Sequence, residues 1–101
     1  MMIFITQLIY IIEGKEKVFD RFEAIAIPSI LKYHGRLLLR VRPTENSFIE
    51  TNIEKPNEIH LIEFNSEQDF ENFKHDEERK KFLYLKDQSI RTSILIKGTK
   101  L

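Results

Sequence analysis

The sequence contains no cysteine and no tryptophan, and it has only three glycines and three prolines among its 101 residues. The absence of cysteine excludes disulfide bonds, thiolate catalysis and cysteine-ligated zinc or iron–sulfur centres, and it is compatible with the cytoplasmic location that we expect. Sixteen basic residues balance sixteen acidic ones. Because proteins that bind nucleic acids carry an excess of positive charge, we expect no nucleic-acid partner.

The first twelve residues are nearly all apolar. This run is too short to span a bilayer, which takes about 20 residues. It also lacks the basic leading residues and the cleavage site of a signal peptide, and it stops at Glu13-Gly14. Its isoleucines and aromatic residues predict a buried strand over residues 3–12, and we expect no membrane association. The length of the chain predicts a single domain over residues 1–101.

A helix is predicted from about Lys15, because Val18, Phe22 and Ile25 recur at helical spacing. Pro28 is expected to kink this helix or to divide it near Ile27, since proline has no N–H and clashes with the preceding turn. Gly35 fits the left-handed residue that commonly follows the last turn of a helix.

Three further strands are predicted over residues 36–42, 58–64 and 92–97, with a long polar connection over residues 43–57. A second helix is predicted to begin after Ser66, with Asp69 as its partner in a capping box. The charged segment 76–81 is interpreted as a solvated helical turn. The order β-α-β-β-α-β predicts an α+β, ferredoxin-like sandwich, in which two helices cover one face of a four-stranded antiparallel sheet and the first and third strands are central.

The first strand is apolar at both odd and even positions, so its pattern does not show which face the helices cover. A strand of this kind is expected to be covered on both faces. Two helices cover only one face, and the other would leave a large hydrophobic patch in water. We therefore predict that the chain is its own partner, in a homodimer joined through its sheets.

Several local patterns resemble a family of small stress-associated proteins of unknown function, the DUF1330 group of the dimeric α/β-barrel superfamily. The residues that carry this resemblance are Pro28, Leu31, Gly35-Arg36, Leu38, Arg40-Val41-Arg42-Pro43, Ile62-Glu63-Phe64 and Ser66. The sequence departs from the family at His34, where the family has glycine, and at Asn65, where it has proline. The resemblance implies a dimeric ferredoxin-like fold but no particular chemistry, because the superfamily includes several unrelated activities.

Arg36 and Arg40 are the first candidates for binding a ligand, because a guanidinium pairs with a carboxylate in a planar fork. Their spacing of four is expected to place them on one face of a strand, about 13 Å apart. An edge strand also carries arginine to discourage aggregation, so ion pairs at the surface are the alternative. Gln7 interrupts the apolar first strand and is a candidate hydrogen-bonding residue of a pocket, and Tyr10 offers a phenol.

His34, His60 and Glu63 are the candidates for catalysis. Each has a structural alternative: His34 at the end of a helix, His60 as a partnered residue of the core, and Glu63 in an ion pair with Arg36 or Arg40. The three histidines are scattered along the chain, and no phosphate-binding or dinucleotide-binding motif is present, so we expect neither a metal site nor a cofactor.

The sequence therefore predicts a small homodimeric protein that binds a small anionic or aromatic molecule in a pocket between sheet and helices. An enzyme that works without a cofactor, of the monooxygenase or isomerase type, is one alternative. A module that binds other proteins is another. The residues alone do not decide whether the chain is an enzyme.

Overall fold

The computed structural model describes residues 1–101, and the predicted order of elements is confirmed. The elements are β1 (Ile3–Ile11), α1 (Glu16–Lys32), β2 (Gly35–Val41), the 3-10 turn η1 (Glu45–Ser47), β3 (Glu58–Phe64), α2 (Glu67–Lys74), α3 (Glu77–Lys81), α4 (Leu83–Ser89) and β4 (Ile90–Gly98). The second helical region thus consists of three short helices, of which α4 was not predicted. No helix is both long enough and apolar enough to cross a membrane.

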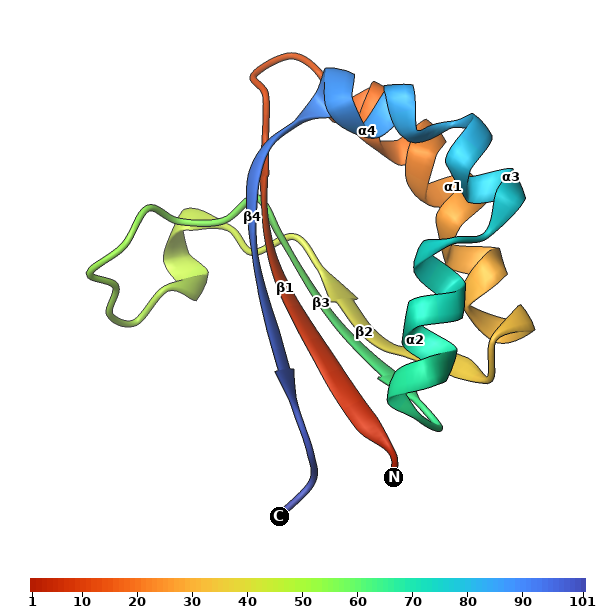
Figure 1. The fold of residues 1–101 in the computed structure, drawn as a ribbon. Helices are drawn as coiled ribbons and strands as arrows, with labels where there is room; N and C mark the ends of the chain where they lie inside the picture. Colours follow the sequence, from red (N-terminus) through yellow and green to blue (C-terminus); the bar gives the residue numbers. More distant parts are fainter.

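The four strands form one antiparallel sheet in the order β2-β3-β1-β4, so β1 and β3 are central, as predicted. All the α helices lie on one side of the sheet, and the connection between β2 and β3 projects on the other side (Figure 1). This arrangement is the ferredoxin-like fold.

The helix-covered face of the sheet holds most of the core. Odd-numbered residues of β1 face the helices, and Ile3 and Ile5 lie opposite Phe64 and Ile62 of β3. The helices contribute buried apolar side chains at Phe19, Phe22, Ala26 and Ile30 of α1, at Phe70 and Phe73 of α2, and at Leu85 of α4. The face that the helices cover, which the sequence pattern left open, is therefore the odd-numbered face of β1.

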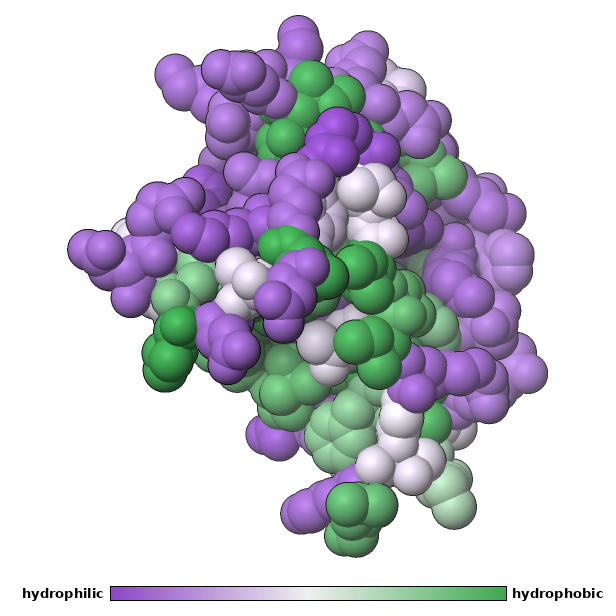
Figure 2. Space-filling view, turned by 90° about the vertical axis from the view of Figure 1, so that its left-hand side faces the viewer, coloured by the Kyte–Doolittle hydropathy of each residue, from purple (hydrophilic) through white to green (hydrophobic).

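The opposite face of the sheet is apolar and uncovered over most of its area, and we call it the open face. Figure 2 looks at the molecule from the side opposite the helices and shows hydrophobic residues gathered across the sheet. The open face carries Phe4 and Leu8 of β1, Leu39 and Val41 of β2, Ile59 and Leu61 of β3, and Ile94 and Ile96 of β4. Among these side chains, Leu39 is 46% exposed and Ile96 is 53% exposed. Water thus contacts a continuous apolar surface.

The end of α1 corrects two expectations. The helix runs unbroken from Glu16 to Lys32 with Pro28 inside it, so the expected division near Ile27 is wrong. The left-handed residue after the helix is His34, with φ 59°, whereas Gly35 already belongs to β2. Gly35 is required for a different reason, because a β carbon there would lie 2.5 Å from the Phe64 ring and 2.7 Å from Ile30.

Strand β2 contains a bulge that changes which side chains share a face. Leu37 lies opposite Ile62, whereas Leu39 lies opposite Leu61, so Leu38 is the extra residue. Because successive residues of a strand point to opposite faces, one extra residue reverses the orientation of everything that follows. The expectation that Arg36 and Arg40 share a face is therefore wrong: Arg36 lies opposite Glu63 on the open face, and Arg40 lies opposite His60 on the helix-covered face.

Replacing Gly35 by alanine tests the close contact between β2 and the aromatic core. The added methyl group meets Phe64 and Ile30, and overpacking of this kind costs about 1–3 kcal/mol. We expect the free energy of unfolding in urea to fall by that amount for Gly35→Ala. Gly98→Ala is the control, because a β carbon at Gly98 has no atom within 4 Å. Equal stability of the two variants would contradict the account of Gly35.

Candidate functional site

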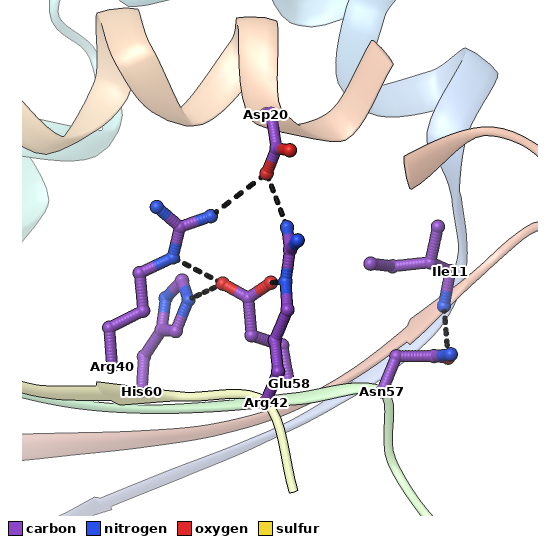
Figure 3. A network of polar contacts seen from close by, with 7 residues as sticks. All are labelled: Ile11, Asp20, Arg40, Arg42, Asn57, Glu58 and His60. Atoms are coloured by element: carbon purple, nitrogen blue, oxygen red, sulfur yellow. Dashed lines mark hydrogen bonds and ion pairs between the residues drawn. The ribbon is translucent and has the colours of Figure 1, made fainter. Parts of the chain in front are cut away.

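A buried carboxylate organises the edge of the sheet next to α1. Glu58, at the start of β3, is 0% exposed, and one of its oxygens accepts a hydrogen bond from His60 Nε2 at 2.7 Å. The same oxygen accepts from Arg40 Nε, and the other accepts from Arg42 Nε at 2.7 Å. Asp20 of α1 completes the group by accepting from both arginines (Figure 3). We call these five residues the Glu58 network.

The bulge in β2 makes the Glu58 network possible. Without the extra residue at Leu38, Arg40 and Arg42 would lie on the open face, away from Glu58 and from α1. With it, both guanidinium groups lie between the sheet and α1, and Figure 3 shows them pointing from β2 toward Asp20. The network therefore holds the edge strand, β3 and α1 together.

The network also sets the protonation of Glu58. Burial alone raises the pKa of this carboxyl, but hydrogen bonds from His60, Arg40 and Arg42 outweigh burial and lower the pKa from 4.5 to about 2. Glu58 is therefore ionised at neutral pH and is already saturated with donors. Since His60 is 1% exposed and bonded to this carboxylate, its place is that of a partnered core residue.

A shallow groove of about 690 Å³ lies beside the network, between α1 and β2. We call it the outer groove. It is lined by Asp20, Glu23, Ala24, Ile27, Pro28, Arg40, Val41 and Arg42. Arg40 is thus the predicted ligand-binding residue that lies at the groove.

A second space, the inner cavity, lies between the sheet and the helices and measures about 50 Å³. Its polar lining is formed by Gln7 of β1, Glu23 of α1, Arg79 of α3, Lys86 of α4 and Ser93 of β4, and its apolar lining includes Phe22 and Phe73. Five elements therefore place polar side chains around one small volume. Gln7 is the only one of the predicted ligand-binding residues that lies there.

Arg79 carries a buried nitrogen without a hydrogen-bond partner at the inner cavity. Its Nε is buried without a hydrogen-bond partner, whereas one terminal nitrogen, Nη1, donates to the Lys74 carbonyl at 3.2 Å. The guanidinium group lies over the rings of Phe22 and Phe73, with its carbon 5.7 Å and 5.2 Å from their centroids. These rings hold the charge in place but offer no acceptor to Nε. A buried donor without a partner costs about 1–3 kcal/mol, so this position favours an acceptor from outside the chain.

Two more charged groups face the inner cavity without an ion pair. Glu23 is 8% exposed, and no hydrogen bond or salt bridge within 4.0 Å satisfies its carboxyl group. Burial raises the pKa of Glu23, although His60 and Arg40 oppose this rise. Burial likewise lowers the pKa of the Lys86 amine, and the charge of Arg79 adds to that effect. Unpaired groups whose pKa values are shifted by burial are typical of binding and catalytic sites.

The remaining predicted residues lie elsewhere. Arg36 forms an ion pair with Glu63, with 2.8 Å between Arg36 Nη2 and Glu63 Oε1. The Tyr10 hydroxyl donates to the Glu54 carbonyl in the connection between β2 and β3 at 2.7 Å. His34 is exposed and contacts Asp69 of α2 at 3.1 Å. The structure does not bring any of these four predicted residues to either of the two spaces.

Sequence reasoning missed the three charged groups of the inner cavity. The burial of Glu23 could have been predicted from helical spacing. Glu23 follows Phe19 by four residues and precedes Ala26 by three, which places its carboxyl group on the buried stripe of α1. Arg79 was interpreted as part of a solvated charge run, and Lys86 lies in the helix that was not predicted. Nothing in their immediate sequence distinguishes these two from surface cations.

The fold is shared with several solved structures. A protein of unknown function from Rhodopseudomonas palustris superposes with a TM-score of 0.82 at 13% identity, covering 99% of this chain and 82% of the other. A DABB family protein with a ferredoxin-like fold from Mesorhizobium loti gives 0.71 at 13% identity, covering 99% and 97%. A dimeric protein of unknown function with a ferredoxin-like fold from Bacteroides fragilis gives 0.68 at 13% identity, covering 96% and 94%. These similarities define the fold class of the chain as ferredoxin-like.

No protein-family model matches the sequence, and no curated protein matches it. At the identities given above, the similarities establish the fold and not the activity.

Replacing Glu58 by glutamine tests the Glu58 network. Because the pKa of Glu58 is below its ordinary value of 4.5, its stabilisation is complete above about pH 4.5 and is lost as the pH falls toward 2. We expect Glu58→Gln to lower the free energy of unfolding at pH 7 by about 3–5 kcal/mol, since it leaves two guanidinium groups without their partner. We also expect the variant to lose less stability than the wild type between pH 5 and pH 2.

The acid profile of Glu58→Gln is read against one other carboxyl group and one control variant. Asp76, whose pKa is also lowered to about 2, remains in the variant and keeps part of the acid dependence. Glu63→Gln is the matched control, because its ion pair with Arg36 is at the surface and is worth about 1 kcal/mol or less. An acid profile of Glu58→Gln identical to that of the wild type would contradict the role of the network.

Proposed function

We propose that the chain is a single-domain homodimer joined through the open faces of its sheets, and that each subunit binds a small organic anion in the inner cavity. The observation that carries the binding proposal is the buried Arg79 Nε, which lacks a partner beside a cavity that a second cation also lines. We keep the cytoplasm as the proposed location, with no nucleic-acid or membrane partner.

The open face supports the dimer. Its apolar side chains belong to all four strands, exposed on β2 and β4 and half-buried on β1 and β3, so the surface is continuous across the sheet. Monomers rarely leave such a patch in water, and a second copy related by a two-fold axis would cover it with an identical surface. One of the solved structures with this fold is described as dimeric. The resemblance to the DUF1330 group belongs to the same proposal, since it implies dimerisation.

The size of the inner cavity favours an anionic ligand over an aromatic one. A water molecule occupies about 30 Å³ in the liquid, and a cavity that accepts benzene measures about 150 Å³. At about 50 Å³ the inner cavity has room for a carboxylate group but not for a ring. Arg79 and Lys86 supply two positive charges against the single carboxyl of Glu23, so an anion balances the charge.

An enzyme is the second candidate, and Glu23 is the observation that favours it. A buried carboxyl group with a raised pKa, close to two cations, has the character of a general base that takes a proton from a bound acid. Glu23 would fill the role for which the sequence suggested His34, His60 or Glu63. A module that binds another protein through the open face is the remaining alternative, and the dimer experiment distinguishes it.

Placing a charge on the open face tests the dimer. Ile94 lies on this face and is exposed, so Ile94→Glu should leave the subunit folded and disrupt the contact between sheets. We expect light scattering during gel filtration to show a dimer for the wild type and a monomer for Ile94→Glu. Leu31→Glu is the control, because Leu31 is also a large apolar residue and is more exposed than Ile94, but lies on α1. A monomeric wild type would overturn the proposed dimer.

Formate is the probe for the inner cavity. In protein labelled with ¹⁵N, the Arg79 Nε–H resonance should shift saturably as formate is added, and an equal concentration of chloride should give a smaller change. The amide shifts around the cavity also report the affinity for formate. Arg79→Gln and Lys86→Met should each lower this apparent affinity tenfold or more, because each removes one cation. Arg21→Gln, at an exposed site of α1, should have no effect. If the Nε–H resonance does not respond, the unpaired donor contacts an internal water molecule and the anion proposal is wrong.

A further inference from the structure

The outer groove contains hydrogen-bond acceptors that lack a partner, whereas the inner cavity contains a donor that lacks one. The two arginines at the groove are already bonded to acids, since Glu58 and Asp20 each accept from both of them. The two positive charges are therefore balanced by two negative charges. Glu23, which lines the groove as well as the cavity, is left over as an acid without a partner.

Pro28 adds a second acceptor to the groove. In an α-helix the N–H of residue 28 bonds to the carbonyl of residue 24, but proline has no N–H. The Ala24 carbonyl therefore lacks its ordinary helical donor, although α1 continues through this position. Ala24 and Pro28 both line the groove and are both exposed.

Glu23 is the strongest of these acceptors. More than nine-tenths of this residue is buried, and its carboxyl group forms neither a hydrogen bond nor an ion pair within the chain. A buried carboxylate is costly unless a donor or a cation accompanies it. Arg40 lies on the same groove but is bonded to Glu58 and Asp20. A ligand that brings its own positive donor would compensate Glu23 without disturbing the network.

The rest of the groove is apolar. Ile27 and Pro28 of α1 line the groove on one side. Val41 of β2 borders it on the other, although its side chain points to the open face. A volume of about 690 Å³ falls within the range of about 300–1,000 Å³ that is typical of sites for small molecules. The groove thus offers an apolar surface next to a carboxyl group without a hydrogen-bond partner and a carbonyl without its helical donor.

We infer that the outer groove binds a small primary amine with an apolar body, whose ammonium group donates hydrogen bonds to the Glu23 carboxylate and the Ala24 carbonyl. The apolar body contacts Ile27 and Pro28. This site is distinct from the proposed anion site, because it takes a ligand of the opposite charge on the opposite side of Glu23. Acidification weakens the binding, since protonation of Glu23 removes the charge that the ammonium group requires.

The probe is 2-phenylethylamine, titrated into ¹⁵N-labelled protein. We expect saturable amide shifts confined to residues 20–28 and 40–42, and much weaker binding of 2-phenylethanol, which has the same apolar body without the charge. Glu23→Gln should weaken binding of the amine by tenfold or more. Pro28→Ala should weaken it about threefold, because the new N–H occupies the Ala24 carbonyl, and this change suits a helix and does not threaten folding.

Glu16→Gln, in the exposed first turn of α1, is the matched control and should bind the amine as the wild type does. Equal binding of the alcohol and the amine would overturn the inference, as would a Glu23→Gln variant that binds the amine normally. Arg79→Gln separates the two sites: it should abolish the response to formate and keep the saturable response to the amine. Loss of both responses in Arg79→Gln would also contradict two independent sites.

Discussion

Strand β1 has no polar face, and the rest of the structure depends on that constraint. Its odd-numbered isoleucines pack against Phe64, Ile62 and the helices, which account for one side of the sheet. Phe4 and Leu8 face the other side, where β2, β3 and β4 add more apolar side chains and no element of the chain covers most of them. Because β1 is central in the sheet, Phe4 and Leu8 lie near the middle of the open face, which is where a second sheet would pack most closely.

The second organising interaction is the Glu58 network, which fixes how the edge strand β2 lies against α1. It depends on one extra residue at Leu38, because the reversal of side-chain orientation brings Arg40 and Arg42 to the helix side. A buried carboxylate with three side-chain donors is stable only when all of them are present, so β2, β3 and α1 are positioned together. The outer groove follows from this arrangement, since its base is formed by these arginines and its wall by α1.

The sequence predicted the elements and their order well, because hydrophobic period and capping residues are local signals. Ser66 and Asp69 marked the start of α2, and the apolar run 3–12 marked a central strand. The errors have physical causes that no local pattern contains. The bulge at Leu38 depends on pairing with β3, so the shared face expected for Arg36 and Arg40 was wrong. The Nε of Arg79 is buried because α3 packs over Phe22 and Phe73, so the sequence alone showed Arg79 as one cation in a charged segment.

The central claim is that the open face is buried against a second copy while each subunit keeps a site for a small molecule. Native mass spectrometry of gently purified protein tests both parts at once. The account predicts a species of twice the 12.1 kDa chain mass, with a mass increment for a small ligand that is lost on mild activation. A bare species at the mass of one chain, persisting at micromolar concentration, would contradict the account, because the apolar surface around β1 would then be stable in water.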